Sequence, residues 1–267
     1  MEIVKQTSTY HTTALKNRKI KYIVIHYTAG VNSKSGHAVS TAKWFATTDR
    51  EGSADFIVDD TTAVQYNADI ENRWSWHCGG SKLKSSKGGS LNGICTNQNS
   101  IGIEVCSSTP DGKTYAANNQ NWYFTDAVVD KAVELTKYLM KRYNIPASNV
   151  VRHYDVTGKF CPGIVGWNAN SGSEAKWNAF KARLTDESES KKEDSSSSFI
   201  PYKVKVSIAT LNIRSGPGTN YAATGKYTGK GIFTITEVKS GKGSNSGWGK
   251  LKSGVGWISL DYTTKYK

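Results

Sequence analysis

The sequence has no long apolar run and few cysteines. With 37% hydrophobic residues and a mean hydropathy of −0.52, the 267-residue chain has the composition of a soluble globular protein, and we expect no membrane insertion. Its start, MEIVKQTSTYHTTALKNRK, lacks the apolar stretch of a secretory signal, so we expect synthesis in a cytoplasm. Four cysteines are too few for a disulfide scaffold and indicate thiols or metal ligands, with a Cys78–Cys95 bridge as the alternative.

Acidic residues are also scarce relative to basic ones. The chain has 35 basic and 22 acidic residues, a net charge of +13. This excess favours a polyanionic partner, which would be nucleic acid, an anionic membrane or an acidic cell-wall polymer. Charge alone does not choose among them.

One segment divides the chain. Residues 185–200, TDESESKKEDSSSSFI, have no apolar periodicity and the composition of a solvated linker. We therefore predict domains at 1–184 and 204–267, joined by a linker at 185–203. The C-terminal part has 11 basic and 2 acidic residues between 203 and 267. Its short β runs, separated by glycines, predict a small all-β barrel or sandwich.

The N-terminal part mixes helices and strands. Apolar residues at three- and four-residue steps predict a helix over 125–146, with Thr125 as N-cap, and a shorter helix over 39–48. Strands are predicted at 22–25, 54–60 and 100–106. In SIGIEVC, Glu104 should face away from the isoleucines. The pattern is that of an α/β or α+β domain.

A histidine at the end of the first of these strands raises the question of its role. A lone buried histidine is commonly a core residue with satisfied ring nitrogens, so a functional role requires partners. VVRHYDVTGKFCPG, 150–163, offers His153 and Cys161. Together with His26 they make three nitrogen or sulfur ligands, the number that a catalytic zinc takes when its fourth position is left for water.

These segments resemble a known family. IVIHYTAG, WHCGG at 76–80, SIGIEVC and RHYDVTGKFCPG are similar, in order and distance, to the signature segments of the zinc-dependent N-acetylmuramoyl-L-alanine amidases of the amidase-2 class. The resemblance covers most of residues 20–182 and implies a mixed central sheet flanked by helices. It also implies that Zn²⁺ is bound by His26, His153 and Cys161, and that the amide between N-acetylmuramic acid and L-alanine of peptidoglycan is hydrolysed.

The reaction also needs a proton carrier and a group that stabilises the oxyanion. We assign the first role to Glu104, a carboxylate on a central strand where burial can raise its pKa. Lys159 lies where several family members carry a lysine that stabilises the oxyanion, and Thr157 is a weaker candidate for the same oxygen. In their ordinary roles, Glu104 would be salt-bridged and Lys159 a solvated loop residue.

Other residues are assigned to substrate binding. His77 resembles a histidine that the family places at the rim of the groove, and Trp76 precedes it. Many relatives have a tyrosine or histidine in the segment SADFIVDD, where this chain has Ala54 and Asp55. That departure leaves more of the work to Glu104, or lets Tyr27 substitute.

The C-terminal segment shows a second resemblance. LNIRSGPGTNY, GWGKL and GVGWISLDY are similar to a bacterial SH3 (SH3b) cell-wall-binding domain over 204–267. An amidase joined to such a domain is the build of a phage endolysin or an autolysin. The resemblance implies an SH3-like barrel and a peptidoglycan-binding monomer that reaches the wall through a holin pore. Trp248, Trp257, Tyr221, Tyr227 and Tyr262 would line a groove or, in the case of the tryptophans, form the core.

Three other classes compete with this interpretation. In a cysteine peptidase Cys161 would be the nucleophile and His153 its base, but those families place cysteine before histidine and His26 would have no role. A non-catalytic peptidoglycan receptor commonly lacks the cysteine ligand that this chain keeps. A nucleic-acid binder is disfavoured because the basic residues are spread along the chain and match no nucleic-acid fold.

Overall fold

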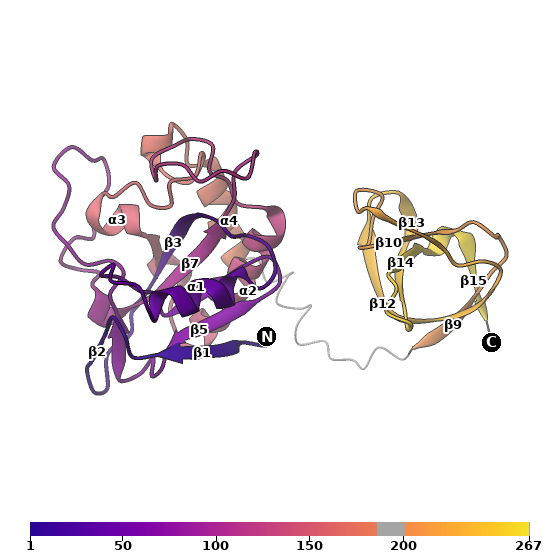
Figure 1. The fold of residues 1–267 in the computed structure, drawn as a ribbon, viewed down its shortest axis with the longest axis horizontal. Coiled ribbons are helices and arrows are strands. Elements are labelled where there is room, and N and C mark those ends of the chain that lie inside the picture. Colours follow the sequence, from indigo (N-terminus) through magenta and orange to yellow (C-terminus); the bar gives the residue numbers. More distant parts are fainter. Residues whose placement is uncertain (186–200, 267) are drawn as a thin grey trace. The chain divides into compact units, whose positions relative to one another are not determined.

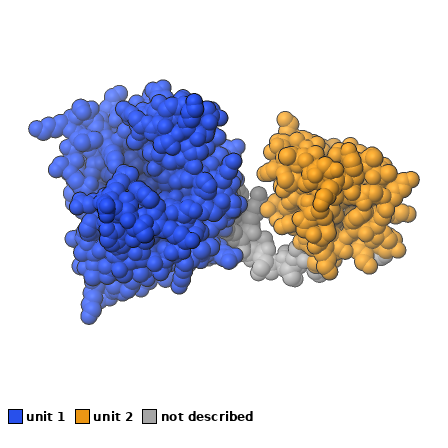
Figure 2. All heavy atoms as spheres, in the orientation of Figure 1, with its two compact units in different colours: residues 1–187 blue, residues 188–267 orange. Residues whose placement is uncertain are grey.

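The chain divides into two compact units, residues 1–187 and 188–267 (Figures 1 and 2). The computed structural model describes residues 1–185 and 201–266. Most of the predicted linker, residues 186–200, lies outside the described residues, so the boundaries 1–184, 185–203 and 204–267 stay predictions. The two units are described separately below.

The N-terminal unit is built on a six-stranded mixed sheet of order β1-β5-β4-β7-β3-β8 (Figure 1). Neighbouring strands are parallel except for the antiparallel pair β4 and β5. A separate pair joins β2 to β6. The strands are β1 Val4–Ser8, β2 Thr12–Ala14, β3 Tyr22–Val31, β4 Phe56–Val58, β5 Ala63–Asn67, β6 Arg73–Ser75, β7 Ser100–Ser107 and β8 Val150–Arg152.

Helices cover both faces of this sheet. They are α1 His37–Phe45, α2 Asp126–Tyr143, α3 His153–Thr157 and α4 Ala175–Thr185, with short 3-10 turns η1 Asn97–Asn99, η2 Ala147–Asn149 and η3 Ala169–Ser171. The apolar sides of α2 and α4 pack on one face in the largest core cluster, while α1 packs on the other face against Ile57, Val64 and Tyr66. This arrangement confirms the predicted mixed sheet flanked by helices.

The long helix α2 confirms the prediction at 125–146. Thr125 is its N-cap, and the Thr125 hydroxyl accepts a hydrogen bond from the Val128 amide at 3.2 Å. The helix ends at Asn144, whose φ of 52° is left-handed, two residues before Pro146. The predicted apolar residues Val128, Ala132, Leu135 and Leu139 are buried against the sheet.

The strands β3 and β7 pair in parallel and alternate as the sequence indicates. Ile101, Ile103 and Val105 face the α2 side, so Glu104 points to the opposite side, as predicted. The end predicted for the first strand is wrong, because β3 continues to Val31 and His26 lies within it. The regular register with β7 stops at Tyr27, which explains why the apolar pattern ends earlier than the strand.

The C-terminal unit is all-β, as predicted. Its strands are β9 Tyr202–Val206, β10 Asn212–Arg214, β11 Ala223–Tyr227, β12 Gly231–Gly241, β13 Ser244–Leu251, β14 Trp257–Ser259 and β15 Thr263–Tyr266, and the 3-10 turn η4 spans Leu260–Tyr262. They form one sheet of order β11-β10-β14-β13-β12-β9-β15. Within residues 201–266 no ladder joins β11 to β15, so a closed barrel is not formed there.

Aliphatic residues such as Val204, Ile235 and Ile258 make the core of this unit. Trp248 and Trp257 are also buried, which places both in the interior, whereas Tyr221, Tyr227 and Tyr262 are exposed. Across the described part of the chain, none of the helices is both long and apolar enough to span a bilayer.

Candidate metal centre and active site

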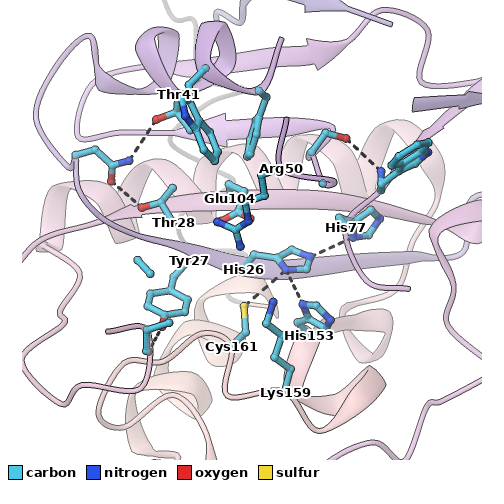
Figure 3. Close-up of a pocket in the computed structure, with 18 of the residues that line it drawn as sticks. His26, Tyr27, Thr28, Thr41, Arg50, His77, Glu104, His153, Lys159 and Cys161 are labelled. Atoms are coloured by element: carbon cyan, nitrogen blue, oxygen red, sulfur yellow. Dashed lines mark hydrogen bonds between the residues drawn. The ribbon is translucent and has the colours of Figure 1, made fainter. Parts of the chain in front are cut away.

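Three predicted ligands from different elements meet at one point. His26 comes from β3, His153 is the first residue of α3, and Cys161 follows in the next loop. His26 Nδ1 lies 3.1 Å from His153 Nδ1 and 3.7 Å from Cys161 Sγ (Figure 3). One ligand atom from each residue lies within 4.8 Å of the other two, and all three residues are buried.

These separations fit a tetrahedral metal ion. Ligand distances of about 2.0–2.1 Å to nitrogen and about 2.3 Å to sulfur imply tetrahedral edges of roughly 3.3 Å between nitrogens and roughly 3.6 Å between nitrogen and sulfur. The observed 3.1 and 3.7 Å are close to both edges. The donor set can therefore hold a transition metal with one position open.

The two histidines are in the protonation state that a metal requires. Burial lowers the pKa of His153 to about 3, with a further contribution from the charge of Lys159. Burial and the neighbouring His153 hold the pKa of His26 well below its usual value. Both imidazoles are therefore neutral at pH 7, whereas burial raises the pKa of the Cys161 thiol to about 12. A metal ion would have to displace that proton.

Glu104 lies on the adjacent strand, opposite His26 in the β3–β7 register. Its Oε2 atom is buried, and no hydrogen-bond partner for it is found among the described residues. Burial raises the pKa of Glu104 to about 8, against the opposing charges of Lys159 and Arg50. A buried carboxylate oxygen without a partner beside a ligand cluster is a strong candidate for a proton carrier.

A pocket of about 620 Å³ opens over the cluster and is lined by His26, His153, Cys161, Glu104 and Lys159. One wall is α1, whose residues at helical spacing line the pocket: His37, Ser40, Thr41 and Trp44. Arg50 lies on the same side of the pocket (Figure 3). Sequence analysis missed this wall, although the helical spacing was readable, because the sequence does not show which face of α1 meets the pocket.

The remaining predicted residues take different positions. Tyr27 and Trp76 line the pocket, but the Tyr27 hydroxyl donates to the Ala117 carbonyl and Trp76 Nε1 donates to Thr13 Oγ1 at 2.9 Å. Thr157 is buried and is not among the pocket residues; its Oγ1 accepts the Lys159 amide at 3.3 Å.

His77 also contacts the pocket, but its side chain is only 1% exposed. Its Nδ1 lies 3.1 Å from His26 Nε2 (Figure 3). So little exposed surface favours a role for His77 other than substrate contact.

Asp55 is a fully buried hydrogen-bond acceptor. Its two oxygens receive hydrogen bonds from Asn67 Nδ2 at 2.7 Å, Ser75 Oγ at 3.0 Å and the Gly102 amide at 2.7 Å. Arg18 Nη1 lies 3.8 Å away. The carboxylate thus links the residue that precedes β4 to β5, β6 and β7.

Comparisons with known proteins identify the family of this chain. A family profile described as N-acetylmuramoyl-L-alanine amidase matches residues 16–164. The amidase CwlL of Bacillus licheniformis is 32% identical over 163 residues, 57% of this chain and 39% of that protein. CwlH of Bacillus subtilis is 32% identical over 150 residues, 55% of this chain and 50% of that protein. The solved structure titled "Structure of PlyL" is 28% identical, covers 70% of this chain and 98% of that one, and has a TM-score of 0.49.

The fold and site define a protein that can hold a metal ion at the base of a pocket, beside a free carboxylate. The profile match spans more than half of the chain, and the chain belongs to the N-acetylmuramoyl-L-alanine amidase family. It spans at most about half the length of the two curated relatives named above.

Proposed function

We propose that this protein hydrolyses the amide bond between N-acetylmuramic acid and L-alanine in peptidoglycan, as a phage endolysin does. The observation that carries the proposal is the buried His26, His153 and Cys161 cluster, next to the unpartnered oxygen of Glu104, in a chain of this family. The profile match covers all three ligands and Glu104.

Zinc is the metal that the donor set favours, because two imidazoles and one thiolate suit its tetrahedral preference. When bound, it would polarise the scissile carbonyl and supply an activated water. His26, His153 and Cys161 would hold it. The pocket walls would orient the substrate so that the scissile amide faces these ligands.

Glu104 is proposed as the proton carrier. Its free Oε2 can take a proton from the attacking water and return it to the leaving nitrogen of L-alanine. Such a group is most effective when its pKa lies near the working pH, and burial raises the pKa of Glu104 to about 8. Lys159, on the opposite side of the pocket, is proposed to stabilise the negative charge that develops on the carbonyl oxygen (Figure 3).

Chelation and metal replacement test this proposal. We expect purified peptidoglycan to be hydrolysed by the untreated protein, to survive the EDTA-treated protein, and to be hydrolysed again after zinc is added back. Glu104→Gln should bind zinc normally and lose about 10²–10⁴-fold in kcat. Full activity in EDTA would instead support the cysteine peptidase, in which Cys161 acts as nucleophile. Zinc binding without hydrolysis would support a receptor.

The C-terminal unit is proposed to be an SH3b-like wall-binding domain over residues 204–267, following a catalytic domain over 1–184. Its strong positive charge and the exposed Tyr221, Tyr227 and Tyr262 support binding to an anionic wall. We propose that the protein acts as a monomer on peptidoglycan after holin-dependent release from the cytoplasm, without binding nucleic acid.

A further inference from the structure

We propose that His77 is a positioning residue that fixes the tautomer and ring orientation of the metal ligand His26. This role rests on the proposed metal centre but goes beyond it, because it concerns a side chain that touches neither metal nor substrate. His77 contacts His26 on one side (Figure 3) and Ser100 on the other.

The direction of these hydrogen bonds follows from the Thr96 carbonyl group, which accepts the hydroxyl proton of Ser100. Ser100 Oγ lies 2.6 Å from the Thr96 carbonyl oxygen, which can only accept, so the single hydroxyl proton of Ser100 is donated there. His77 Nε2 lies 3.2 Å from the same Oγ. With its proton already used, Ser100 can only accept from His77, so His77 Nε2 carries a proton, and the Asp55 carboxylate lies 4.0 Å from the same nitrogen. Burial opposes protonation of His77, but Cys78 and Asp55 raise its pKa on balance, so the ring is neutral and has a single tautomer only above that pKa.

The tautomer of His26 follows from that of His77. In the neutral His77 ring, a proton on Nε2 leaves Nδ1 as an acceptor, and the group 3.1 Å away is His26 Nε2. His26 must then carry its own proton on Nε2. Its bare nitrogen is Nδ1, the atom that faces His153 and Cys161. The hydrogen-bond chain thus presents a lone pair of His26 to the ligand cluster before any metal binds.

The backbone is shaped to receive the His77 ring. A Cβ atom added at Gly102, on β7, would lie 2.6 Å from His77 Cγ, well inside van der Waals contact. The Gly102 amide donates to Asp55, which holds this part of β7 in place. Any larger residue at position 102 would collide with the His77 ring, so the glycine in SIGIEVC is explained by the packing of His77.

Nitrogen chemical shifts of the histidine rings test the tautomers directly. In the metal-free protein, long-range ¹H–¹⁵N spectra recorded along an alkaline titration, at the pH where both rings are neutral, should show the Nε2-protonated form for both His26 and His77. Finding His77 protonated on Nδ1 would overturn the proposal, whatever the protein does with zinc. Ser100→Ala removes the acceptor of the Nε2 proton while leaving both histidines in place, and should release the tautomer preference of His77.

Zinc affinity, measured by competition with a chromophoric chelator, tests the consequence. His77→Leu should weaken zinc binding by about 10–100-fold, the range typical of lost outer-sphere partners. His77→Asn keeps an acceptor oxygen near the position of Nδ1 and should recover most of that loss. Cys106→Ala is a buried change on β7, the strand that carries Ser100 and Gly102. It lies outside the chain of hydrogen bonds and therefore controls for general destabilisation.

The visible spectrum of bound Co²⁺ provides a second readout. His77→Leu should keep the thiolate charge-transfer band of Cys161 while shifting the ligand-field bands that report the geometry of His26. If the wild-type protein binds zinc and His77→Leu binds it equally well, the positioning role is wrong. If the wild-type protein fails to bind zinc, the metal centre itself is wrong, and the two failures are thereby distinguished.

Discussion

At the scale of single residues, burial shifts the pKa values of the histidines and of Glu104 in opposite directions and favours the uncharged form of each. His26 and His153 have low pKa values because they are buried, while burial raises the pKa of Glu104 to about 8. The same desolvation thus keeps the imidazoles free to bind a cation and the carboxyl ready to exchange a proton. A bound cation would lower the pKa of Glu104.

Glu104 makes the metal-free protein less stable as the pH rises. Its folded-state pKa of about 8 lies above the usual 4.5, so its stabilising contribution is complete below pH 4.5 and is lost as the pH rises through 8. Glu104→Gln does not titrate. In EDTA, we expect this variant to unfold with the same free energy as wild type near pH 4.5, and to be more stable by a few kcal/mol near pH 9.

Thermal and chemical unfolding across this pH range measures the difference. Glu71→Gln, a change at an exposed glutamate, provides the control and should track the wild type at each pH. A difference between Glu104→Gln and wild type that does not vary with pH would contradict the burial of the Glu104 carboxylate.

The proposed role of Lys159 is to stabilise, through its charge, the oxygen of the scissile carbonyl. Lys159→Ala should lower kcat by about 10²-fold with little change in zinc affinity, because the loss of one oxyanion donor has that magnitude. Lys159→Arg should retain much of the activity. Steady-state hydrolysis of a soluble muramyl peptide measures both, with the exposed Lys84→Ala as control. An unchanged kcat for Lys159→Ala would make this lysine a solvated loop residue.

At the scale of elements, the N-terminus of α2 offers a clean test of local structure. Thr125 caps the helix through its hydroxyl oxygen. Thr125→Ala should lower the free energy of unfolding by about 1 kcal/mol, whereas Thr125→Asp should keep the cap. Denaturation followed by far-ultraviolet circular dichroism reports on this unit, since the α-helices of the described residues all lie in it. Equal stability of Thr125→Ala and wild type would contradict the capping role.

Elements with strong periodicity were predictable, and those set by tertiary contacts were not. The helix at 125–146 shows an apolar stripe, a cap residue and a terminating proline, so its type and limits follow from local rules. The full length of β3 was missed because residues 28–30 are polar or small, and the strand pairs with β7 again only at Val31, opposite Ser107, after an irregularity in the register.

The candidate site was also predictable in part: local sequence segments could be read, and tertiary contacts could not. His26, His153 and Cys161 occur in segments with a family resemblance, so these candidate ligands could be named from the sequence, and the structure brings them together. The partners of His77 could not, because Ser100 and His26 reach it only after β3 and β7 pair. Gly102 was the one readable signal, since an isolated glycine inside a strand indicates a close approach by another group.

At the scale of the whole molecule, the two units are expected to divide catalysis from wall binding. Deleting residues 201–267 should leave hydrolysis of a soluble muramyl peptide unchanged, because the whole pocket lies in the first unit. Binding to purified cell walls in a sedimentation assay should fall strongly. In the intact chain, binding should weaken as salt screens the positive charge of residues 203–267. Wall binding that survives both deletion and high salt would assign it to the first unit.

The bond that is cut tests the central claim most directly. Purified peptidoglycan should be digested with the zinc-loaded protein and, in parallel, with the EDTA-treated protein, and the released fragments analysed by mass spectrometry. We predict free stem peptides with a new L-alanine amino terminus and glycan strands whose lactyl groups carry newly freed carboxylates, in the zinc-loaded digest alone. New termini inside the stem peptide or cross-bridge, formed equally in EDTA, would contradict the account.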